Sequence, residues 1–171
     1  MIAFLAIVLL AELAAITYGV LHDQVTIRIC LEYFTEAHPK VLDDPSPTLL
    51  AATWGVLATW WVGLPLGILL AMAARWGPGP KRAPASLVRP LGRLLLLMGT
   101  AAALAAVIGY LAHTLAWNPL SGYWAEQLPA ERHARFQSAW WAHLTSYGFA
   151  AFGGLWLVGR VALKRRSAAR R

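Results

Sequence analysis

The chain has few charged residues and almost no cysteine. Only 13% of its 171 residues are Asp, Glu, Lys or Arg, against about 25% in an ordinary soluble domain. This shortage excludes a disordered chain, a solvated coiled coil and most soluble enzymes. The single cysteine, Cys30, excludes an intramolecular disulfide framework, a CxxC redox motif and a multi-cysteine zinc ribbon.

Long apolar runs take the place of charge, since 58% of the residues are hydrophobic. Four runs reach or exceed the roughly 20 residues that a bilayer-spanning helix needs. Buried helices of soluble proteins are rarely this long with so few charges, so the pattern predicts an all-α fold, an integral membrane four-helix bundle. We expect a single transmembrane domain with spans at residues 2–21, 49–74, 94–117 and 139–163.

The first span has to be distinguished from a secretory signal peptide, which starts with basic residues and ends in a small-residue cleavage site. Here no Lys or Arg precedes the apolar run, and Glu12 lies inside it. We therefore expect this span to be retained as a membrane helix.

The basic residues are divided unevenly between the two sides of this bundle. Loop 75–93 and the residues from Arg160 onward carry eleven of the fifteen basic residues and no acidic one. Loops 22–48 and 118–138 carry the other four, together with seven of the eight acidic residues. The positive-inside rule then places both termini in the cytoplasm and these two loops on the extracytoplasmic face.

The net charge of +7 would by itself suggest a nucleic-acid partner. The basic tail, KRRSAARR at residues 164–171, has no aromatic residue or binding motif interleaved with it, so we expect no nucleic acid to bind. A stop-transfer segment that contacts anionic lipid is the better interpretation. The expected partner is therefore the lipid bilayer.

Loop 22–48 contains an alternating pattern. Apolar and polar residues alternate along positions 25–31, which predicts a short, half-buried strand. We expect this extracytoplasmic loop to be ordered and to cap the helix ends. Arg28 would then pair with one of three carboxylates, those of Asp23, Glu32 and Glu36.

A ridge of small residues runs along the second span. Gly55, Gly63 and Gly67 recur at multiples of four residues, which lets another helix approach closely. We interpret the ridge as packing inside the bundle. The alternative is contact with a second copy or with a larger membrane complex. Pro65 predicts a kink in the same span.

All five histidines fall on the extracytoplasmic side or at span ends on that side. His22 ends the first span, His113 lies near the end of the third, and His143 lies near the start of the fourth. Each has a tyrosine one helical turn away on the same face. These tyrosines are Tyr18, Tyr110 and Tyr147.

Three histidines from three helices, with Asp23 or Glu32 as the acidic partner, have the composition of a catalytic metal site. Imidazole and carboxylate ligands suit Zn, Cu or Fe. We predict that these side chains converge just below the extracytoplasmic surface. Metal affinity should then fall as pH drops through about 6.5, the ordinary pKa of histidine. No HExxH or similar spacing is present, so hydrogen-bonded structural histidines are the alternative.

Two other functions fit the same residues. His113 and His143 could hold haem b between facing helices, which would indicate an electron carrier. The protein could instead be a non-catalytic accessory subunit of a larger membrane complex. Cys30 could be a soft metal ligand or a small, half-buried residue.

Glu12 lies near the middle of the first span, where a charged carboxylate costs a few kcal/mol. A hydrogen bond to Thr59 or Thr100 would satisfy it. The functional alternative is a proton path toward the expected site, because Glu12 and Asp23 lie on nearly the same helix face.

One segment resembles a known family. Residues 18–39, YGVLHDQVTIRICLEYFTEAHP, followed by SPTLLAATWGVLATWWVG at 46–63, are similar to a family of small bacterial inner-membrane proteins. The pattern HDQxTxRxCxEYF is the sharpest part of the match. The resemblance implies a bacterial inner-membrane location and carries over no catalytic residue.

Overall fold

The computed structural model describes residues 1–170 and contains, within them, helices and no β-strand. Four segments are long and apolar enough to cross a membrane, namely Ile2–Ile29, Pro47–Arg75, Ala85–Thr114 and Ala130–Ala169. Helices suit this environment because every backbone N–H and C=O finds its partner within the segment. The expected all-α fold with four spanning helices is confirmed.

Two of these segments are single helices and two are divided. The single helices are α1 (Ile2–Ile29) and α5 (Ala85–Thr114). The divided segments are α3 (Pro47–Leu57) with α4 (Trp60–Arg75), and the short 3-10 helix η1 (Ala130–Arg132) with α7 (His133–Ala169). The connections hold two further short helices, α2 (Glu32–Thr35) and α6 (Tyr123–Gln127).

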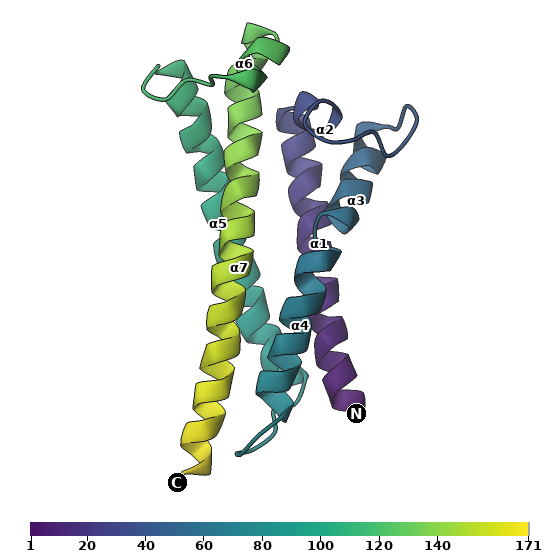
Figure 1. Ribbon diagram of the computed structural model, residues 1–171, viewed down its shortest axis with the longest axis vertical. Coiled ribbons are helices and arrows are strands. Elements are labelled where there is room, and N and C mark those ends of the chain that lie inside the picture. The colour runs from purple at the N-terminus through teal and green to yellow at the C-terminus, as the bar shows by residue number, and fades with distance from the viewer. Residues whose placement is uncertain (171) are drawn as a thin grey trace.

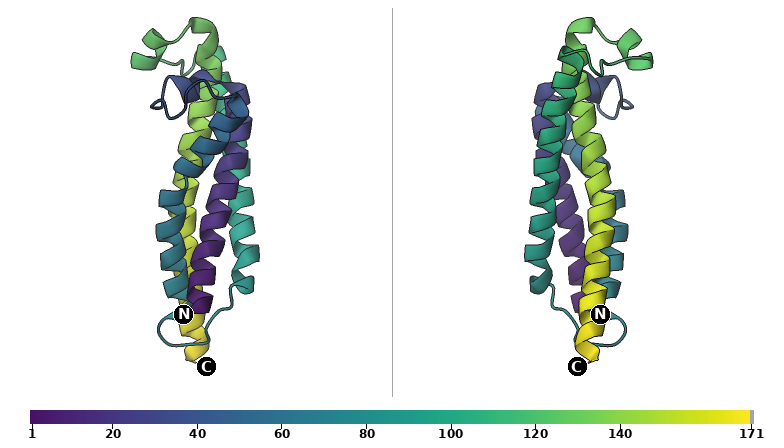
Figure 2. Two further views of the ribbon diagram at one scale, coloured as in Figure 1. Left: turned by 90° about the vertical axis from the view of Figure 1, so that its right-hand side faces the viewer. Right: turned by 90° about the vertical axis from the view of Figure 1, so that its left-hand side faces the viewer.

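The long helices form two packed groups (Figure 1). Helix α5 packs along α7, while α1 packs along α3 and α4, and the groups meet where α4 contacts α7 and α1 contacts α5. Both termini and the 76–84 connection lie at one end, which we call the basic end. The opposite end, which we call the loop end, carries α2 and α6 (Figure 2).

The strand expected at residues 25–31 is wrong, because α1 continues through Ile29. Buried positions follow the helical spacing instead, with Asp23, Thr26, Ile27 and Cys30 facing inward. The hydroxyl of Thr26 also donates to the carbonyl of His22, four residues earlier, at 3.1 Å. Apolar residues at alternate positions satisfy a period of two without preventing a helix, so the short run was ambiguous.

Arg28 does not pair with any of the carboxylates expected for it. Its guanidinium donates to the backbone carbonyl of Gln24, to the Gln24 side chain at 2.8 Å, and to the hydroxyl of Thr48 at 3.1 Å. Gln24 in turn donates to the carbonyl of Thr48 at 2.8 Å. These bonds join the last turns of α1 to the first turn of α3.

The second span breaks at Ala58 and Thr59, one to two turns before Pro65. The hydroxyl of Thr59 donates to the carbonyl of Gly55 at 2.6 Å. This local bond competes with the helical backbone pattern. The span is therefore divided into α3 and α4 before the proline, and Pro65 itself lies inside α4.

The glycine ridge packs against α1. A Cβ on Gly55 would lie 2.5 Å from the backbone N and Cα of Val20, and one on Gly63 would lie 2.7 Å from the Cβ of Ala15. Gly67 likewise faces α1, at Ala11. The internal packing of the ridge agrees with the closeness that small residues permit. Association with a second copy or a larger complex stays a prediction.

At the loop end, a buried apolar cluster joins the two groups of helices. It draws residues from α1, α2, α3, the 118–128 connection and α7. Tyr33 and Phe34 of α2 are buried in it beside Phe136 of α7. The segment after α1 therefore packs across the bundle, onto α7.

Arg165 joins the chain at the basic end. It is only 3% exposed, and its guanidinium donates to five backbone carbonyls of α4 and the following turn, those of Ala73, Trp76, Gly77, Gly79 and Pro80. All five N–H donors of an arginine can be satisfied in this way. A cation also interacts favourably with the carbonyls at a helix C-terminus. The tail expected as a separate basic segment is thus the last part of α7, which ends at Ala169.

Helix α5 begins at Ala85, whereas we expected the loop to extend to residue 93. Its first turns include Pro90, which lacks the N–H that would bond to an earlier carbonyl. Arg89 and Arg93 consequently lie on a helix. The connection between α4 and α5 is reduced to residues 76–84.

The ridge generates a stability prediction. Gly55→Ala should destabilise the folded protein by about 2–3 kcal/mol, because the new methyl meets backbone atoms that cannot move aside. Gly148→Ala is the matched control, since a Cβ on Gly148 has nothing within 4 Å and alanine favours helix. Unfolding of the two variants in detergent measures the difference. Equal stability of both variants would contradict the packing of α1 on α3.

Candidate metal centre

Three chemistry-bearing side chains meet between α1 and α7. His22 and Asp23 lie about two turns before the end of α1 at Ile29, and His143 lies on α7. Asp23 and His143 are 4% and 7% exposed. We call these three residues the His–Asp–His cluster.

The two ring nitrogens of His143 have different partners. Nδ1 lies 2.8 Å from the carbonyl oxygen of Ala139, and since a carbonyl only accepts, Nδ1 carries a proton and donates it. Nε2 lies 3.2 Å from Oδ1 of Asp23. In the neutral ring Nε2 is an acceptor, as is the carboxylate. A positive species, either a proton or a metal ion, must therefore lie between these two atoms.

His22 completes the cluster with an unpaired nitrogen. Its Nε2 is buried and has no hydrogen-bond partner. The ring lies edge-on to His143 with centroids 4.7 Å apart, and it stacks on Tyr18 at 5.5 Å. A buried polar atom without a partner is costly and requires an explanation.

One ligand atom from each of His22, Asp23 and His143 lies within 4.8 Å of the others. Within residues 1–170, this is the one group of three or more His, Cys, Asp or Glu residues that is close enough to hold a metal ion. Zinc ligands at about 2.0–2.2 Å in a tetrahedron lie about 3.3 Å apart. The His143–Asp23 separation already matches that edge. No two of the three ligand atoms are more than 4.8 Å apart, so binding one zinc ion would require them to close by up to about 1.5 Å.

A small cavity borders the cluster. Its volume is about 60 Å³ and its walls include the three cluster residues, Tyr18, Ser146 and Tyr147. Tyr18 and Ser146 share a hydrogen bond of 2.8 Å between their hydroxyls. Most of its lining is apolar, and its polar groups come from the cluster, Tyr18, Tyr147 and neighbours such as Ser146. We call it the cluster cavity, and its volume gives room for a few water molecules. It does not hold a porphyrin, so the haem b alternative loses its pocket at His143.

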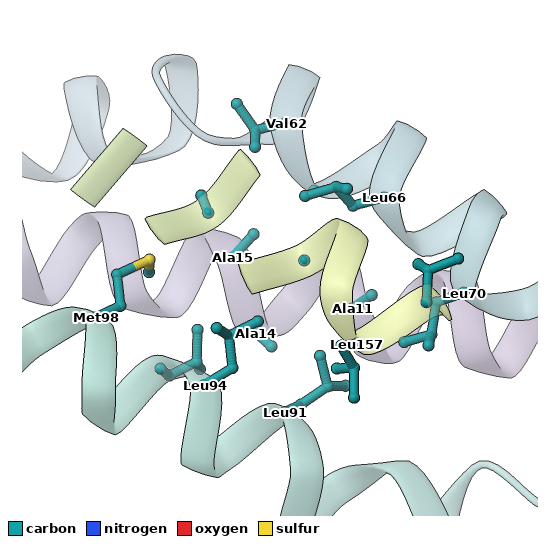
Figure 3. A pocket seen from close by; sticks show the side chains of 15 residues that line it. Ala11, Ala14, Ala15, Val62, Leu66, Leu70, Leu91, Leu94, Met98 and Leu157 are labelled. Atoms are coloured by element: carbon teal, nitrogen blue, oxygen red, sulfur yellow. The ribbon is translucent and has the colours of Figure 1, made fainter. Parts of the chain in front are cut away.

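Below it lies a second cavity of about 70 Å³, apolar and enclosed by the four long helices (Figure 3). The two cavities share four wall residues, Ala15, Val62, Met98 and Ala150. Alanines of α1 and leucines of α4, α5 and α7 surround the second cavity. An apolar void of this kind stays dry, so it separates the polar cluster from the basic end.

A groove on the side of the bundle adjoins the cluster cavity. It lies between α4 and α7, has a volume of about 650 Å³, and shares Val62 and Tyr147 with that cavity. Tyr147 is 38% exposed. This tyrosine therefore stands between the side of the bundle and the cluster.

Aromatic residues cover the cluster at the loop end. The ring of Tyr33 lies 4.4 Å from that of His143, centroid to centroid, and Phe34 lies 5.7 Å from it. Burial raises the pKa of Tyr33 above its ordinary value, so its hydroxyl stays protonated. The sequence predicted that loop 22–48 caps the helix ends, but it did not identify Tyr33 and Phe34 as the residues that cover His143.

His38 supports the same cover. Its Nδ1 donates to the carbonyl of Tyr33 at 2.7 Å, and its ring lies 4.6 Å from that of Trp54. Burial lowers the pKa of His38 below its ordinary value. The neutral ring is thus the form that the folded cover favours.

The structure does not bring His113 into the cluster. Nδ1 of His113 accepts the backbone N–H of Leu120 at 3.0 Å, and its ring meets that of His133 edge-on at 5.6 Å. Its neighbour Tyr110 is 44% exposed. Helix α5 packs on α7, and at this height His113 is engaged by the turn that follows α5.

Glu32 lies in a different environment from the one expected. It pairs with Nε of Arg132 at 3.1 Å and accepts the thiol proton of Cys30 at 3.3 Å. Burial raises the pKa of Cys30 to about 12, so the thiol stays protonated and is unsuited to ligate a metal. Asp23 therefore remains as the acidic member of the cluster.

The hydrogen bond expected for Glu12 is absent from the described residues. Thr59 donates to Gly55, and Thr100 donates to the carbonyl of Leu96 at 2.9 Å. Oε2 of Glu12 is buried beside Gly63 and has no partner. Both threonines use the carbonyl four residues back in their own helix, a choice that sequence spacing does not reveal.

Comparison of the chain with protein-family models, curated proteins and solved structures finds no match. The function must therefore be inferred from the geometry of the cluster.

The cover generates a pH prediction. Because the pKa of His38 is lower when it is buried, the opened segment binds a proton more readily than the closed one. Stability of the cover should be constant above about pH 6.5 and should fall as pH drops below that value. Hydrogen-exchange protection of residues 30–38, corrected for intrinsic rates, measures this stability.

His38→Asn is the control, because its amide can still donate to Tyr33 but does not titrate. Protection in this variant should vary less between pH 7.5 and pH 5 than in the wild type. Equal pH dependence in both proteins would contradict the role of His38, and rapid exchange throughout at pH 7.5 would show that the cover is not ordered.

Proposed function

We propose that the His–Asp–His cluster binds a transition-metal ion, zinc above all, and that the protein is a membrane metalloenzyme that activates water. The observation that carries the proposal is the pairing at His143. Its Nδ1 is committed to a carbonyl, while its Nε2 faces a carboxylate oxygen at 3.2 Å. A metal ion between these atoms satisfies both lone pairs.

The surroundings of the cluster support the same assignment. A metal-binding histidine usually donates its other nitrogen to a carbonyl or carboxylate, which fixes the ring. His143 does so through Ala139. The unpaired Nε2 of His22 gains a partner when an ion is bound. The composition of two histidines and one carboxylate occurs in catalytic zinc sites, where a water fills the fourth position.

The cluster cavity supports a catalytic use of that fourth position. It borders all three ligands and has room for water, and a zinc ion lowers the pKa of bound water to about 7. Hydrolysis is the reaction class that such a water serves. Tyr18 and Ser146, hydrogen-bonded to each other on the cavity wall, could orient it.

The groove between α4 and α7 supports a membrane-soluble reactant. It is lined by side chains such as Trp61, Pro65 and Leu155, and it shares Tyr147 with the cluster cavity. An apolar molecule could approach the metal from the bilayer without crossing the aromatic cover.

Metal binding is tested directly on detergent-purified protein. We expect about one zinc per chain by elemental analysis, and tetrahedral cobalt absorption when Co²⁺ replaces it. His22→Gln, His143→Gln and Asp23→Asn should each weaken Co²⁺ binding by more than about 100-fold, beyond the loss that removal of an outer-shell partner causes. His113→Gln should bind as the wild type does.

His113→Gln is the matched control, since it removes a histidine at the same end of the bundle but outside the cluster. Equal binding by all four variants would contradict the site. A folded protein that binds no metal would instead favour the non-catalytic accessory subunit.

We also propose that the protein lies in a bacterial inner membrane with its basic end in the cytoplasm. The support is the charge division between the two ends and the position of both termini at the basic end (Figure 1). Ala85→Cys, in a chain carrying Cys30→Ser, should react with a membrane-impermeant maleimide only after the cells are opened. Labelling in intact cells would reverse the orientation.

A further inference from the structure

A second groove lies at the basic end, between α5 and α7, on the side of the bundle. Its volume is about 410 Å³. The groove is distinct from the His–Asp–His cluster, which lies toward the loop end. We call it the basic groove.

Four cationic side chains line this groove, those of Arg82, Arg93, Arg160 and Lys164. No acidic residue occurs at positions 45–125 or 133–171 of the sequence. Within residues 1–170, none of the four cations forms a salt bridge. The groove therefore presents a positive charge that no carboxylate of this chain neutralises.

The cations that line the groove differ from Arg165 in their environment, although Arg160 and Lys164 lie on the same helix as Arg165. Arg165 is buried and bonded to five carbonyls, so it caps α4 and the turn that follows. Arg93, Arg160 and Lys164 are exposed. Their ammonium and guanidinium groups are available to a ligand.

The remainder of the groove is apolar and follows the two helices away from the basic end. Leu94 and Leu97 of α5 face Phe149 and Trp156 of α7 across it. From Arg160 to Phe149 the helix rises about 16 Å, at roughly 1.5 Å per residue. This depth is about half of the roughly 30 Å hydrocarbon core, which is one leaflet.

Trp156 links the charged and apolar parts. The guanidinium carbon of Arg160 lies 4.9 Å from the centre of the Trp156 ring, a cation–π contact that holds the arginine over the groove. Tryptophan beside a cation at this depth is typical of the membrane–water interface. The groove thus has a positive entrance at the end that carries Arg160 and Lys164, and an apolar floor along Leu97 and Phe149.

We propose that the basic groove binds one anionic phospholipid. Its phosphate contacts Arg93, Arg160 and Lys164, and one acyl chain lies along Leu97 and Phe149. Basic pockets between transmembrane helices bind anionic lipid head groups by this chemistry. A free phosphate would use the cations alone and leave the leaflet-deep apolar floor without a role.

The test is titration of detergent-purified protein with phosphatidylglycerol, with bound lipid counted by native mass spectrometry. The variant Arg93→Gln, Arg160→Gln, Lys164→Gln should lose affinity on the order of 100-fold, since each cation near an anionic lipid contributes about fivefold. The matched control Lys81→Gln, Arg89→Gln, Arg170→Gln removes the same charge from the same end but outside the groove. It should lose less than about tenfold, by weaker long-range attraction.

Several outcomes would overturn the proposal. Equal losses in the two triple variants would indicate general attraction between charges. Equal affinity of the wild type for phosphatidylcholine would show that the head-group charge is not recognised. Displacement of the lipid by inorganic phosphate at comparable concentration would indicate a free-anion site.

A positional readout does not depend on the variants. Phosphatidylglycerol carrying a photoreactive group midway along one acyl chain should label peptides from α5 and α7 that contain Leu97 and Phe149. Labelling confined to α1, α3 and α4 would place the lipid elsewhere and contradict the proposal.

Discussion

The contact between His143 and Asp23 is the interaction on which the rest of the site depends. Both side chains are buried between α1 and α7, and an isolated charge in such a place is very costly. The contact therefore fixes the register of the two helices at this height. It places His22 edge-on to His143, and the cluster cavity borders the same three residues. The rings of Tyr33 and Phe34 then cover His143 at the loop end.

The two ends of the bundle handle polarity in different ways. At the loop end, polar side chains pair with one another across helices, as His143 does with Asp23 and Glu32 with Arg132. At the basic end, Arg165 is satisfied by backbone carbonyls, and the other cations have no acidic partner in the described chain. The first arrangement brings together side chains that could hold a cation, whereas the second leaves cationic side chains exposed. The apolar cavity in the middle keeps the two apart.

The sequence predicted the fold well because a bilayer leaves few alternatives to long apolar helices. It predicted less of the site. Topology alone placed His22, Asp23 and His143 at the same end of the bundle, so they could be proposed as a site. Which helices contact one another depends on side-chain packing, and the spacing of residues along the sequence does not predict it. His113 lies at the same end and was included for the same reason, yet on α5 its side chain contacts the backbone of Leu120 and the ring of His133.

The run at residues 25–31 fits both the period of a strand and that of a helix. Only the burial of Thr26, Ile27 and Cys30 in the structure distinguishes the helix from the strand. The apolar cover and the carbonyl of Ala139 carry no sequence signature.

The central claim is that a metal ion lies between two imidazoles and a carboxylate. X-ray absorption spectroscopy of the zinc-loaded protein tests it most directly, because the spectrum reports the ligand atoms and their distances. The expected result is a shell of four nitrogen and oxygen ligands at about 2.0–2.2 Å, with outer-shell scattering from two imidazole rings. A sulfur ligand at about 2.3 Å would place the metal on Cys30, and a spectrum without imidazole scattering would place it outside the His–Asp–His cluster. Either result would contradict the account.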